Sequence, residues 1–205
     1  MIGILNARSG NIGSLENALN YLKIDYSIIE KKDQIKSDMN IILPGVGSFH
    51  KLMQNLNDLN FTSSLLDFIN NNRPFLGICV GMQILLEYGF EEKKTKGLGV
   101  FKGNVKKFDK SSNSKVPFIS WVKINLSEKN RANTILQKCY SNEYYFLHSY
   151  FCDLDSDENV VAYSKYNNTK YPAIINKNKV FGVQFHPEKS RETGLQLLKN
   201  FSEIR

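Results

Sequence analysis

The chain has 205 residues, of which 41% are hydrophobic and 23% are charged, and its formal net charge is +7. These values predict a single globular domain, residues 1–205, and exclude an intrinsically disordered chain. No segment approaches the roughly 20 consecutive apolar residues of a membrane-spanning helix, and the N-terminus lacks the charged start and long apolar stretch of a secretory peptide.

Apolar runs alternate with helical patterns through the first half of the chain. Strands are predicted over Ile2–Asn6, Asp25–Ile29 and Asn40–Leu43, and helices over Ile12–Leu22 and Thr62–Asn71. Such alternation with short connections predicts an α/β fold, a three-layer sandwich whose mainly parallel sheet is covered by helices on both faces.

The third of these strands runs into a loop that is bracketed by two glycines, in the run LPGVGSF. Gly45 and Gly47 give this loop the freedom to turn backbone N–H groups inward, where such groups stabilise an oxyanion. Taken alone, a loop of this kind is more often a simple turn or a phosphate cradle.

The most informative segment is an apolar strand that breaks at a glycine, presents Cys79, and restarts as a helix predicted to reach Tyr88. Gly77 and Gly81 lie two residues before and after the thiol, where a Cβ would collide with a sharp strand-to-helix turn. A thiol at the start of a helix also faces unpaired N–H groups, which favour an anionic nucleophile. The elbow alone is equally compatible with a buried structural cysteine.

The second half of the chain, from Gly99 to Phe185, has a β-rich pattern. Turn signals at Asn113-Ser114, Asn167-Asn168 and Asn176-Lys177-Asn178 predict antiparallel hairpins added to the sheet. A final helix is predicted over Thr193–Phe201.

The strand Val180–Phe185 ends in a His-Pro-Glu run. A cysteine nucleophile needs a base within hydrogen-bond reach and an acceptor that orients this base, and His186 and Glu188 can fill those two roles. The alternative is an ordinary histidine at the end of a strand. Only three histidines are present, and His148 is the main rival as the base, although no acidic residue lies within two positions of it.

The three cysteines, Cys79, Cys139 and Cys152, form neither a metal-binding pattern nor a disulfide framework. No cofactor motif accompanies them, so we expect chemistry that uses no metal and no cofactor. Because a reactive thiol survives best in a reducing compartment, we expect the protein in the cytoplasm.

Part of the positive charge is concentrated in one segment, which contains Lys102, Lys106, Lys107, Lys110 and Lys115. Alternating lysines on a strand are typical of a solvated face, and no recognition-helix or RNA-binding aromatic pattern accompanies them. We therefore expect no nucleic-acid partner. A local basic field would still attract an acidic or phosphorylated partner.

Taken together, the runs LPGVGSF, GICVGMQ, FLHSY and VQFHPEKS resemble the class I glutamine amidotransferases, specifically the glutaminase subunits of imidazole glycerol phosphate synthase. The resemblance extends from GNIGSLENAL near the N-terminus to GLQLLKNF near the C-terminus. It implies a flavodoxin-like fold with added antiparallel strands, and an enzyme that hydrolyses L-glutamine to glutamate and ammonia.

The resemblance also implies roles for individual residues. Those that match the catalytic triad are Cys79, His186 and Glu188, and those that match the oxyanion hole are Gly47 and Val80. Those that match the substrate site are Gln83, His148, Ser149 and Tyr150. Those near the subunit contact are Trp121, Tyr145 and Lys189, for which the alternatives are core packing of the two aromatic residues and a plain surface charge for the lysine.

By the same resemblance, the partner is a (β/α)8-barrel cyclase that receives the ammonia in a heterodimer and serves histidine biosynthesis. Two segments depart from the family pattern, Asn6-Ala7-Arg8-Ser9-Gly10 and Phe118-Ile119-Ser120-Trp121-Val122. They keep open a paralogue that feeds ammonia to a sugar-modifying synthase, which forms acetamidino groups on surface glycans. Alternatives of other classes are a non-enzymatic scaffold that binds a synthase, and a peptidase or chaperone with an elbow cysteine.

Overall fold

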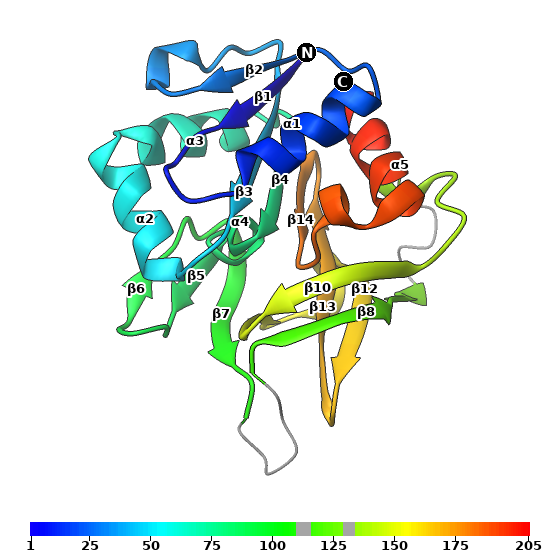
Figure 1. Ribbon diagram of the computed structural model, residues 1–205. Helices are drawn as coiled ribbons and strands as arrows, with labels where there is room; N and C mark the ends of the chain where they lie inside the picture. The colour runs from blue at the N-terminus through cyan, green and yellow to red at the C-terminus, as the bar shows by residue number, and fades with distance from the viewer. Residues whose placement is uncertain (110–115, 129–133) are drawn as a thin grey trace.

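The computed structural model describes residues 1–109, 116–128 and 134–205. Its largest sheet has eight strands in the order β2-β1-β3-β4-β14-β13-β12-β9 (Figure 1). Five strands are parallel: β2 (Tyr26–Ile29), β1 (Ile2–Leu5), β3 (Asn40–Gly45), β4 (Phe75–Cys79) and β14 (Val180–Val183). Three antiparallel strands extend the sheet: β13 (Thr169–Lys177), β12 (Val160–Tyr166) and β9 (Asn125–Leu126).

Helices cover both faces of this sheet (Figure 1). On one face lie α1 (Ile12–Tyr21) and α5 (Arg191–Ser202), and on the other lie α2 (Phe49–Asp58) and α3 (Phe61–Asn70). Right-handed crossovers explain this division, because the chain moves from β1 to β2 in one direction across the sheet and from β3 to β4 in the other. The predicted three-layer α/β architecture is confirmed.

Two smaller sheets lie beside the central one. The first pairs β8 (Phe118–Lys123) antiparallel with β10 (Glu143–His148). The second has the order β11 (Tyr150–Leu154), β7 (Phe101–Lys107), β5 (Leu86–Gly89) and β6 (Thr95–Lys96). Short 3-10 helices are η1 (Lys32–Gln34), η3 (Thr134–Leu136), η4 (Asp157–Asn159) and η5 (Pro187–Lys189).

The predicted turns agree with the hairpins that the structure describes. The turn at Asn167-Asn168 joins β12 to β13, and Asn167 has a left-handed φ of 51°. Asn176 lies at the end of β13, where its side-chain amide donates to the Asn178 carbonyl at 2.8 Å and stabilises the turn into β14. The predicted turn at Asn113-Ser114, together with Lys110 and Lys115, lies outside the described residues.

The predicted helix from the elbow to Tyr88 is wrong. The helix α4 spans only Val80–Gln83, and β5 follows it. Contacts with residues further along the chain explain why the helix ends there. The Leu98 N–H donates to the Ile84 carbonyl, and Leu86 pairs with β7. The run from 84 to 86 is fully buried, and an apolar run of this length fits a buried helix or strand equally well.

A further difference is α2, which has no counterpart among the predicted helices. Its N-cap is Ser48, whose side chain accepts a hydrogen bond from the Lys51 N–H at 3.3 Å. Its buried face includes Phe49, Leu52 and Leu56, and this spacing is that of one side of a helix.

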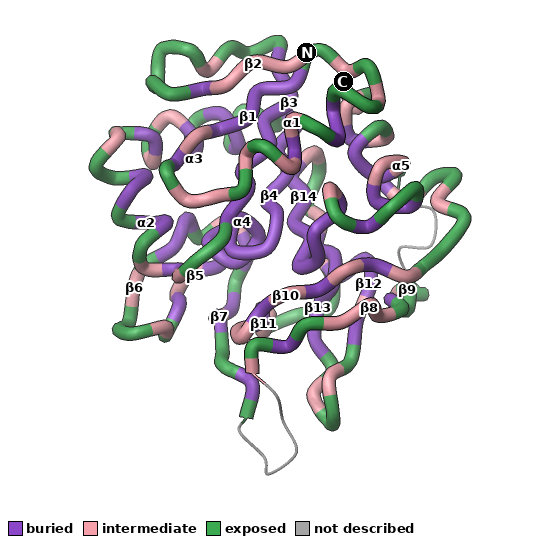
Figure 2. Tube along the Cα trace, viewed as in Figure 1, coloured by how far each residue is buried: buried purple, intermediate pink, exposed green. Residues whose placement is uncertain are grey.

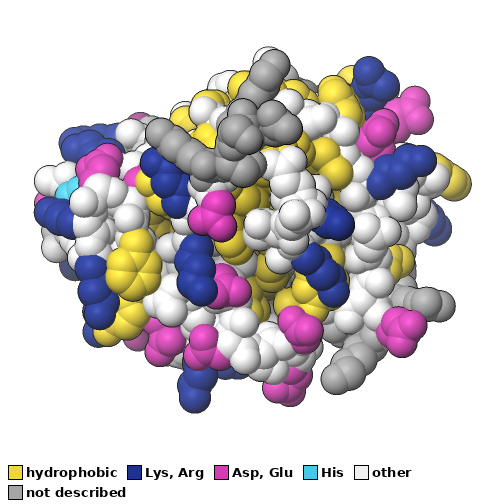
Figure 3. All heavy atoms as spheres, turned by 90° about the horizontal axis from the view of Figure 1, so that it is seen from below, with side chains coloured by type: hydrophobic (Ala, Val, Ile, Leu, Met, Phe, Trp, Pro, Cys, Tyr) yellow, Lys and Arg dark blue, Asp and Glu magenta, His cyan; other side chains and the backbone are white. Residues whose placement is uncertain are grey.

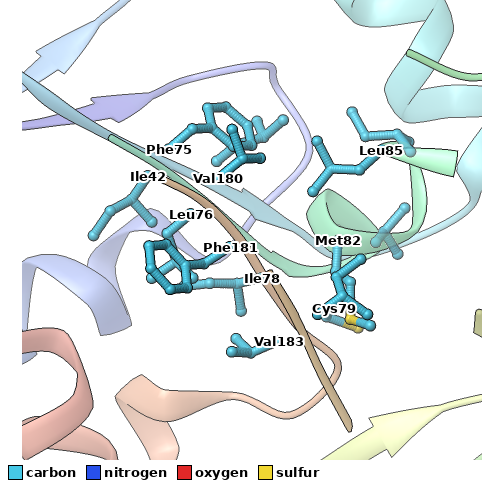
Figure 4. Close-up of a cluster of buried hydrophobic side chains, with 14 of the residues drawn as sticks. Ile42, Phe75, Leu76, Ile78, Cys79, Met82, Leu85, Val180, Phe181 and Val183 are labelled. Carbon is cyan, nitrogen blue, oxygen red and sulfur yellow. The ribbon is translucent and has the colours of Figure 1, made fainter. Parts of the chain in front are cut away.

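The centre of the molecule is formed by β3, β4 and β14, which are buried along their whole length (Figure 2). Side chains such as Ile42, Leu76 and Phe181 pack around these strands, and Cys79 lies at the edge of the same cluster beside Met82 (Figure 4). In register, Gly45 faces Cys79 and Val183 faces Ile78. The loops that follow the three strands therefore leave the sheet at one edge, where ligands bind in open α/β sheets.

Two glycines permit this close arrangement. A Cβ at Gly77 would meet the backbone of Gly81, and a Cβ at Gly81 would meet the carbonyl oxygen of Leu43. In both cases the obstacle is backbone in a neighbouring segment, which has no rotamer to change. The sequence-based explanation for the paired glycines is therefore confirmed in its steric part.

We expect Gly81→Ala to lower the free energy of unfolding by about 3 kcal/mol or more, because the added methyl group displaces β3 or the elbow. Urea denaturation measures the change. The matched control is Gly13→Ala, whose Cβ would meet only the Asn11 side chain at 3.9 Å in the first turn of α1. It should raise the free energy of unfolding by about 0.5–1 kcal/mol, and equal stability of the two variants would contradict the steric explanation.

Candidate active site

Cys79 is the last residue of β4 and the N-cap of α4. Its backbone has φ 55° and ψ −111°, a conformation that is costly for a residue with a Cβ and that is found mainly at functional sites. The side chain is 4% exposed. The sharp turn predicted from the glycine spacing is therefore present, with the thiol at its apex.

Besides the neighbouring His186, the sulfur of Cys79 has two hydrogen-bonding contacts. The thiol donates to the Leu147 carbonyl of β10, with a sulfur-to-oxygen distance of 3.7 Å. The side-chain amide of Gln184 donates to the sulfur, with a nitrogen-to-sulfur distance of 3.7 Å. Sequence reasoning missed Gln184, which directly precedes the Phe-His-Pro-Glu run and shows only a strand pattern.

His186 follows β14 and lies 2% exposed at the same edge of the sheet. Its Nδ1 donates to Oε1 of Glu188 at 2.8 Å. Its Nε2 is buried and makes no hydrogen bond within the described residues. Burial lowers the pKa of His186, but the neighbouring Cys79 and Glu188 outweigh this effect and raise the pKa to about 10.

A pocket of about 180 Å³ lies above the elbow, smaller than the 300–1,000 Å³ typical of drug-sized ligands. The residues that line it include residues from the loops after β3, β4 and β14 and from the start of β11. Among the residues proposed from sequence, those that line it are Gly47, Cys79, Val80, Gln83, His148, Ser149, Tyr150 and His186. Glu188 adjoins this pocket through His186, because its Oε1 accepts the hydrogen bond from Nδ1 of that ring.

The carbonyl of Tyr150 is a hydrogen-bond acceptor for two of these side chains. It accepts a hydrogen bond from Nε2 of Gln83 at 2.8 Å and another from Nδ1 of His148 at 2.8 Å. Burial lowers the pKa of His148 to about 4, despite the bond to Tyr150. His148 is therefore neutral at physiological pH, and its ring packs against aromatic side chains that include Phe108, at a centroid distance of 5.2 Å.

Glu91 is a pocket residue that sequence reasoning missed. Its Oε2 accepts a hydrogen bond from the Phe49 N–H at 2.8 Å, at the first residue of α2. Burial raises the pKa of Glu91, and the bond from Phe49 opposes that rise. No local signal marks this residue, because Glu91-Glu92 reads as an exposed charged turn and only the position of α2 makes Glu91 part of the pocket.

The glycine-bracketed loop lines the pocket through Val46 and Gly47. Gly47 has φ 102°, which only glycine adopts readily. The Ser9 hydroxyl donates to the Val46 carbonyl at 2.6 Å. Because a peptide unit is planar and trans, this bond also fixes the direction of the Gly47 N–H, which points away from Ser9.

Ser190 holds the backbone of the histidine and was also missed. Its buried hydroxyl accepts a hydrogen bond from the Tyr145 N–H at 2.9 Å and donates one to the His186 carbonyl at 2.6 Å. The His186 N–H donates to the Tyr145 carbonyl at 2.9 Å. This closed ring of bonds fastens His186 to β10, and it depends on a strand far away in the sequence.

The residues proposed for a subunit contact lie on the outward face of β8 and β10 and on η5. Trp121 and Tyr145 are partly exposed and pack edge to face, with ring centroids 5.8 Å apart. The Arg191 guanidinium lies 4.5 Å over the indole ring. Lys189 is exposed, as is Ile119 beside the two aromatic residues, so this face contributes a hydrophobic surface next to the pocket rather than core packing.

The described residues bear on three other kinds of feature: a metal site, a membrane-spanning helix and a basic surface. Within residues 1–109, 116–128 and 134–205, no three His, Cys, Asp or Glu side chains are grouped to hold a metal ion. None of the described helices combines the length and hydropathy needed to cross a bilayer. On the face seen in Figure 3, acidic side chains are interspersed among the basic ones, and Lys106 pairs with Asp153.

Comparisons with known proteins agree with this geometry. The family model "Glutamine amidotransferase class-I" matches residues 4–204. Subunits HisH of imidazole glycerol phosphate synthase from Halalkalibacterium halodurans, Caldanaerobacter subterraneus and Leptospira interrogans are 37%, 40% and 38% identical to the chain. Each alignment covers 100% of this chain and 96%, 98% and 100% of the relatives, respectively.

Solved structures support the fold. The structure of PurLQS from Thermotoga maritima has a TM-score of 0.74 at 18% identity and covers 98% of this chain and 96% of that one. A crystal structure of a glutamine amidotransferase has a TM-score of 0.70 at 17% identity and covers 98% of both chains.

Glu188→Gln removes the carboxylate from Nδ1 of His186, so we expect the pKa of His186 to fall. The raised pKa, to which Cys79 and then Glu188 contribute, means that the partners of the imidazolium stabilise the fold fully below 6.5, the ordinary value, and that this effect is lost as the pH rises towards about 10. In urea titrations, the free energy of unfolding of the variant should lie furthest below wild type near pH 6 and converge with it near pH 10.

The control for this prediction is Glu192→Gln, which changes an exposed carboxylate in the first turn of α5. It should follow wild type across the pH range. A stability gap for Glu188→Gln that stays constant with pH, or widens towards pH 10, would show that the ion pair does not contribute to the raised pKa.

Proposed function

Because the chain belongs to the class I glutamine amidotransferases and, within them, to the HisH subunits of imidazole glycerol phosphate synthase, we propose that it hydrolyses L-glutamine and supplies ammonia for histidine biosynthesis. The observation that carries this proposal is the meeting of three segments at one pocket. Cys79 lies on the strained elbow, and His186 lies beside it with Glu188 on its far nitrogen.

The chemistry uses these residues in a fixed order. Because Cys79 and Glu188 raise the pKa of His186, Nε2 of His186 holds the proton that the Cys79 thiol gives up, and the sulfur attacks the side-chain amide carbon of glutamine. His186, as imidazolium held by Glu188, then protonates the nitrogen as the carbon–nitrogen bond breaks and ammonia leaves. Water, activated by the same histidine, attacks the glutamyl thioester, releases glutamate, and regenerates the thiol.

The tetrahedral intermediates carry a negative oxygen that needs N–H donors. We assign these donors to the backbone amides of Val80 and Gly47. Val80 is the first residue of α4, whose initial N–H groups have no partner within the helix. Gly47 lies in a loop whose peptide orientation is held by Ser9.

Binding of the amino-acid end of glutamine requires a partner for its ammonium group. We assign this role to Glu91, because Oε2 is engaged by the Phe49 N–H and a carboxylate has further acceptor capacity for a cation. Gln83, His148, Ser149 and Tyr150 form the adjoining wall. The two hydrogen bonds to the Tyr150 carbonyl make this wall rigid.

Ammonia is protonated in neutral water and then is no longer a nucleophile, so it must pass directly to the site that uses it. We propose that a (β/α)8-barrel cyclase binds over the pocket as a heterodimer and receives it. The proposed contact includes the exposed Ile119 and Lys189 and the partly exposed Trp121 and Tyr145. Aromatic residues such as Trp121 and Tyr145 are enriched at interface centres.

The paralogue that serves glycan amidination uses the same glutaminase chemistry and differs in the acceptor protein. Glutamine hydrolysis measured with purified cyclase, and separately with purified sugar-modifying synthase, therefore distinguishes the two functions. Stimulation of glutamine hydrolysis by the cyclase supports histidine biosynthesis, whereas stimulation by the synthase alone supports the paralogue.

We expect Cys79→Ala to lower the rate of glutamine hydrolysis by at least about a thousandfold, with or without the cyclase, because no nucleophile remains. Release of glutamate measures the rate. Cys139→Ala, which changes a partly buried thiol away from the pocket, should hydrolyse glutamine as wild type does. Hydrolysis that survives in Cys79→Ala would exclude the thioester route, and a wild-type chain that consumes no glutamine with either partner would exclude the glutaminase.

Glu91→Gln should raise the KM for glutamine about 10- to 100-fold with a smaller change in kcat, because a charge-assisted contact to the substrate ammonium group is lost. Steady-state kinetics in the presence of the cyclase measures both constants. Glu92→Gln, an exposed neighbour, is the control and should leave KM unchanged. If Glu91→Gln alters kcat alone, the carboxylate acts elsewhere than on the ammonium group.

A further inference from the structure

Besides His186, the sulfur of Cys79 has one neighbour suited to each of its protonation states. The Leu147 carbonyl accepts a hydrogen bond from the neutral thiol but repels a thiolate. The Gln184 side-chain amide, with its nitrogen 3.7 Å from the sulfur, gives a hydrogen bond that strengthens when the sulfur is negative. The mechanism above uses neither group.

The direction of the Gln184 amide is set by a chain of hydrogen bonds. Oε1 of Gln184 accepts from Nε2 of Gln83 at 3.2 Å. That same nitrogen donates to the Tyr150 carbonyl, which cannot donate in return. A flipped Gln184 would bring two NH2 groups face to face, so its own NH2 group must point to the sulfur.

The far end of this chain is equally fixed. His148 donates its Nδ1 proton to the Tyr150 carbonyl at 2.8 Å. Gln184, Gln83 and His148 are 0%, 2% and 5% exposed, so water does not compete for their hydrogen bonds. We name the set formed by His148, the Tyr150 carbonyl, Gln83 and Gln184 the amide relay.

We propose that Gln184 is a catalytic residue whose side-chain N–H stabilises the Cys79 thiolate, and that the amide relay holds this donor in place. The inference rests on the proposed role of Cys79 as the nucleophile. In the step concerned, the thiol proton moves to Nε2 of His186, and the electron pair left on sulfur accepts the Gln184 N–H. A neutral donor of this kind stabilises the anion without forming an ion pair that would have to be broken during attack.

Alkylation of Cys79 by iodoacetamide tests the inference, because only the thiolate reacts and no glutamine turnover is needed. The rate at Cys79 is followed in the full chain by peptide mass spectrometry across a pH series, which separates it from Cys139 and Cys152. Gln184→Met removes the donor at similar length. Gln184→Glu keeps the acceptor for Gln83 and places an oxygen against the sulfur.

Gln184→Met should move the pH midpoint of alkylation upward by about one unit and slow the reaction about tenfold at pH 7. Gln184→Glu should move it at least as far, because a carboxylate repels the thiolate. Gln196→Glu makes the same chemical change on α5, where the Gln196 side-chain amide donates to Asn200, and should match wild type. A Gln184→Met profile that coincides with wild type overturns the inference.

Wild-type protein gives a second test in case the Gln184 variants do not fold. In nuclear magnetic resonance spectra, the side-chain amide proton signals of Gln184 should shift as Cys79 loses its proton, and Cys79→Ala should lack this shift. Signals that stay in place through the titration overturn the inference. Either result is independent of whether the chain hydrolyses glutamine, so the failure of the relay and the failure of the proposed function are distinguishable.

Discussion

The close approach of the Cys79 elbow to the neighbouring strand is the constraint on which the site depends. The elbow can lie against β3 only because Gly77 and Gly81 have no Cβ, and Gly45 on β3 is equally confined, with an added Cβ 2.6 Å from the Gly81 nitrogen. This contact places the end of β3 beside the thiol, and the parallel pairing of β14 with β4 places His186 on the other side. Contacts between backbone segments therefore determine where Cys79 and His186 lie.

Around this centre, the buried polar groups are held mainly by neutral partners. Gln83 donates to Gln184 and, like Nδ1 of His148, to the Tyr150 carbonyl, which lowers the cost of burying these groups. The charged side chains His186 and Glu188 pair directly. A site arranged in this way keeps its shape while a single proton moves between sulfur and imidazole, since only the two groups that exchange the proton change their charge.

The sequence predicted the parts of this site whose signals are local. Glycines at fixed offsets from Cys79, and an acid two residues after His186, are consequences of geometry within a few residues, so they can be read without the fold. Glu91, Gln184 and Ser190 were missed because their roles depend on Phe49, Cys79 and Tyr145, which lie far from them in the chain. The same cause explains the error at β5, where pairing with β7 overrides the apolar pattern.

One consequence concerns Trp121. It is the only tryptophan in the chain, and it lies partly exposed under the Arg191 guanidinium on the face that adjoins the pocket. Its indole emission therefore comes from this face alone, with no background from elsewhere in the polypeptide. If a protein lacking tryptophan binds there and excludes water from the ring, the intensity and wavelength of this emission will change. Binding at this surface can therefore be followed by the fluorescence of the unlabelled chain.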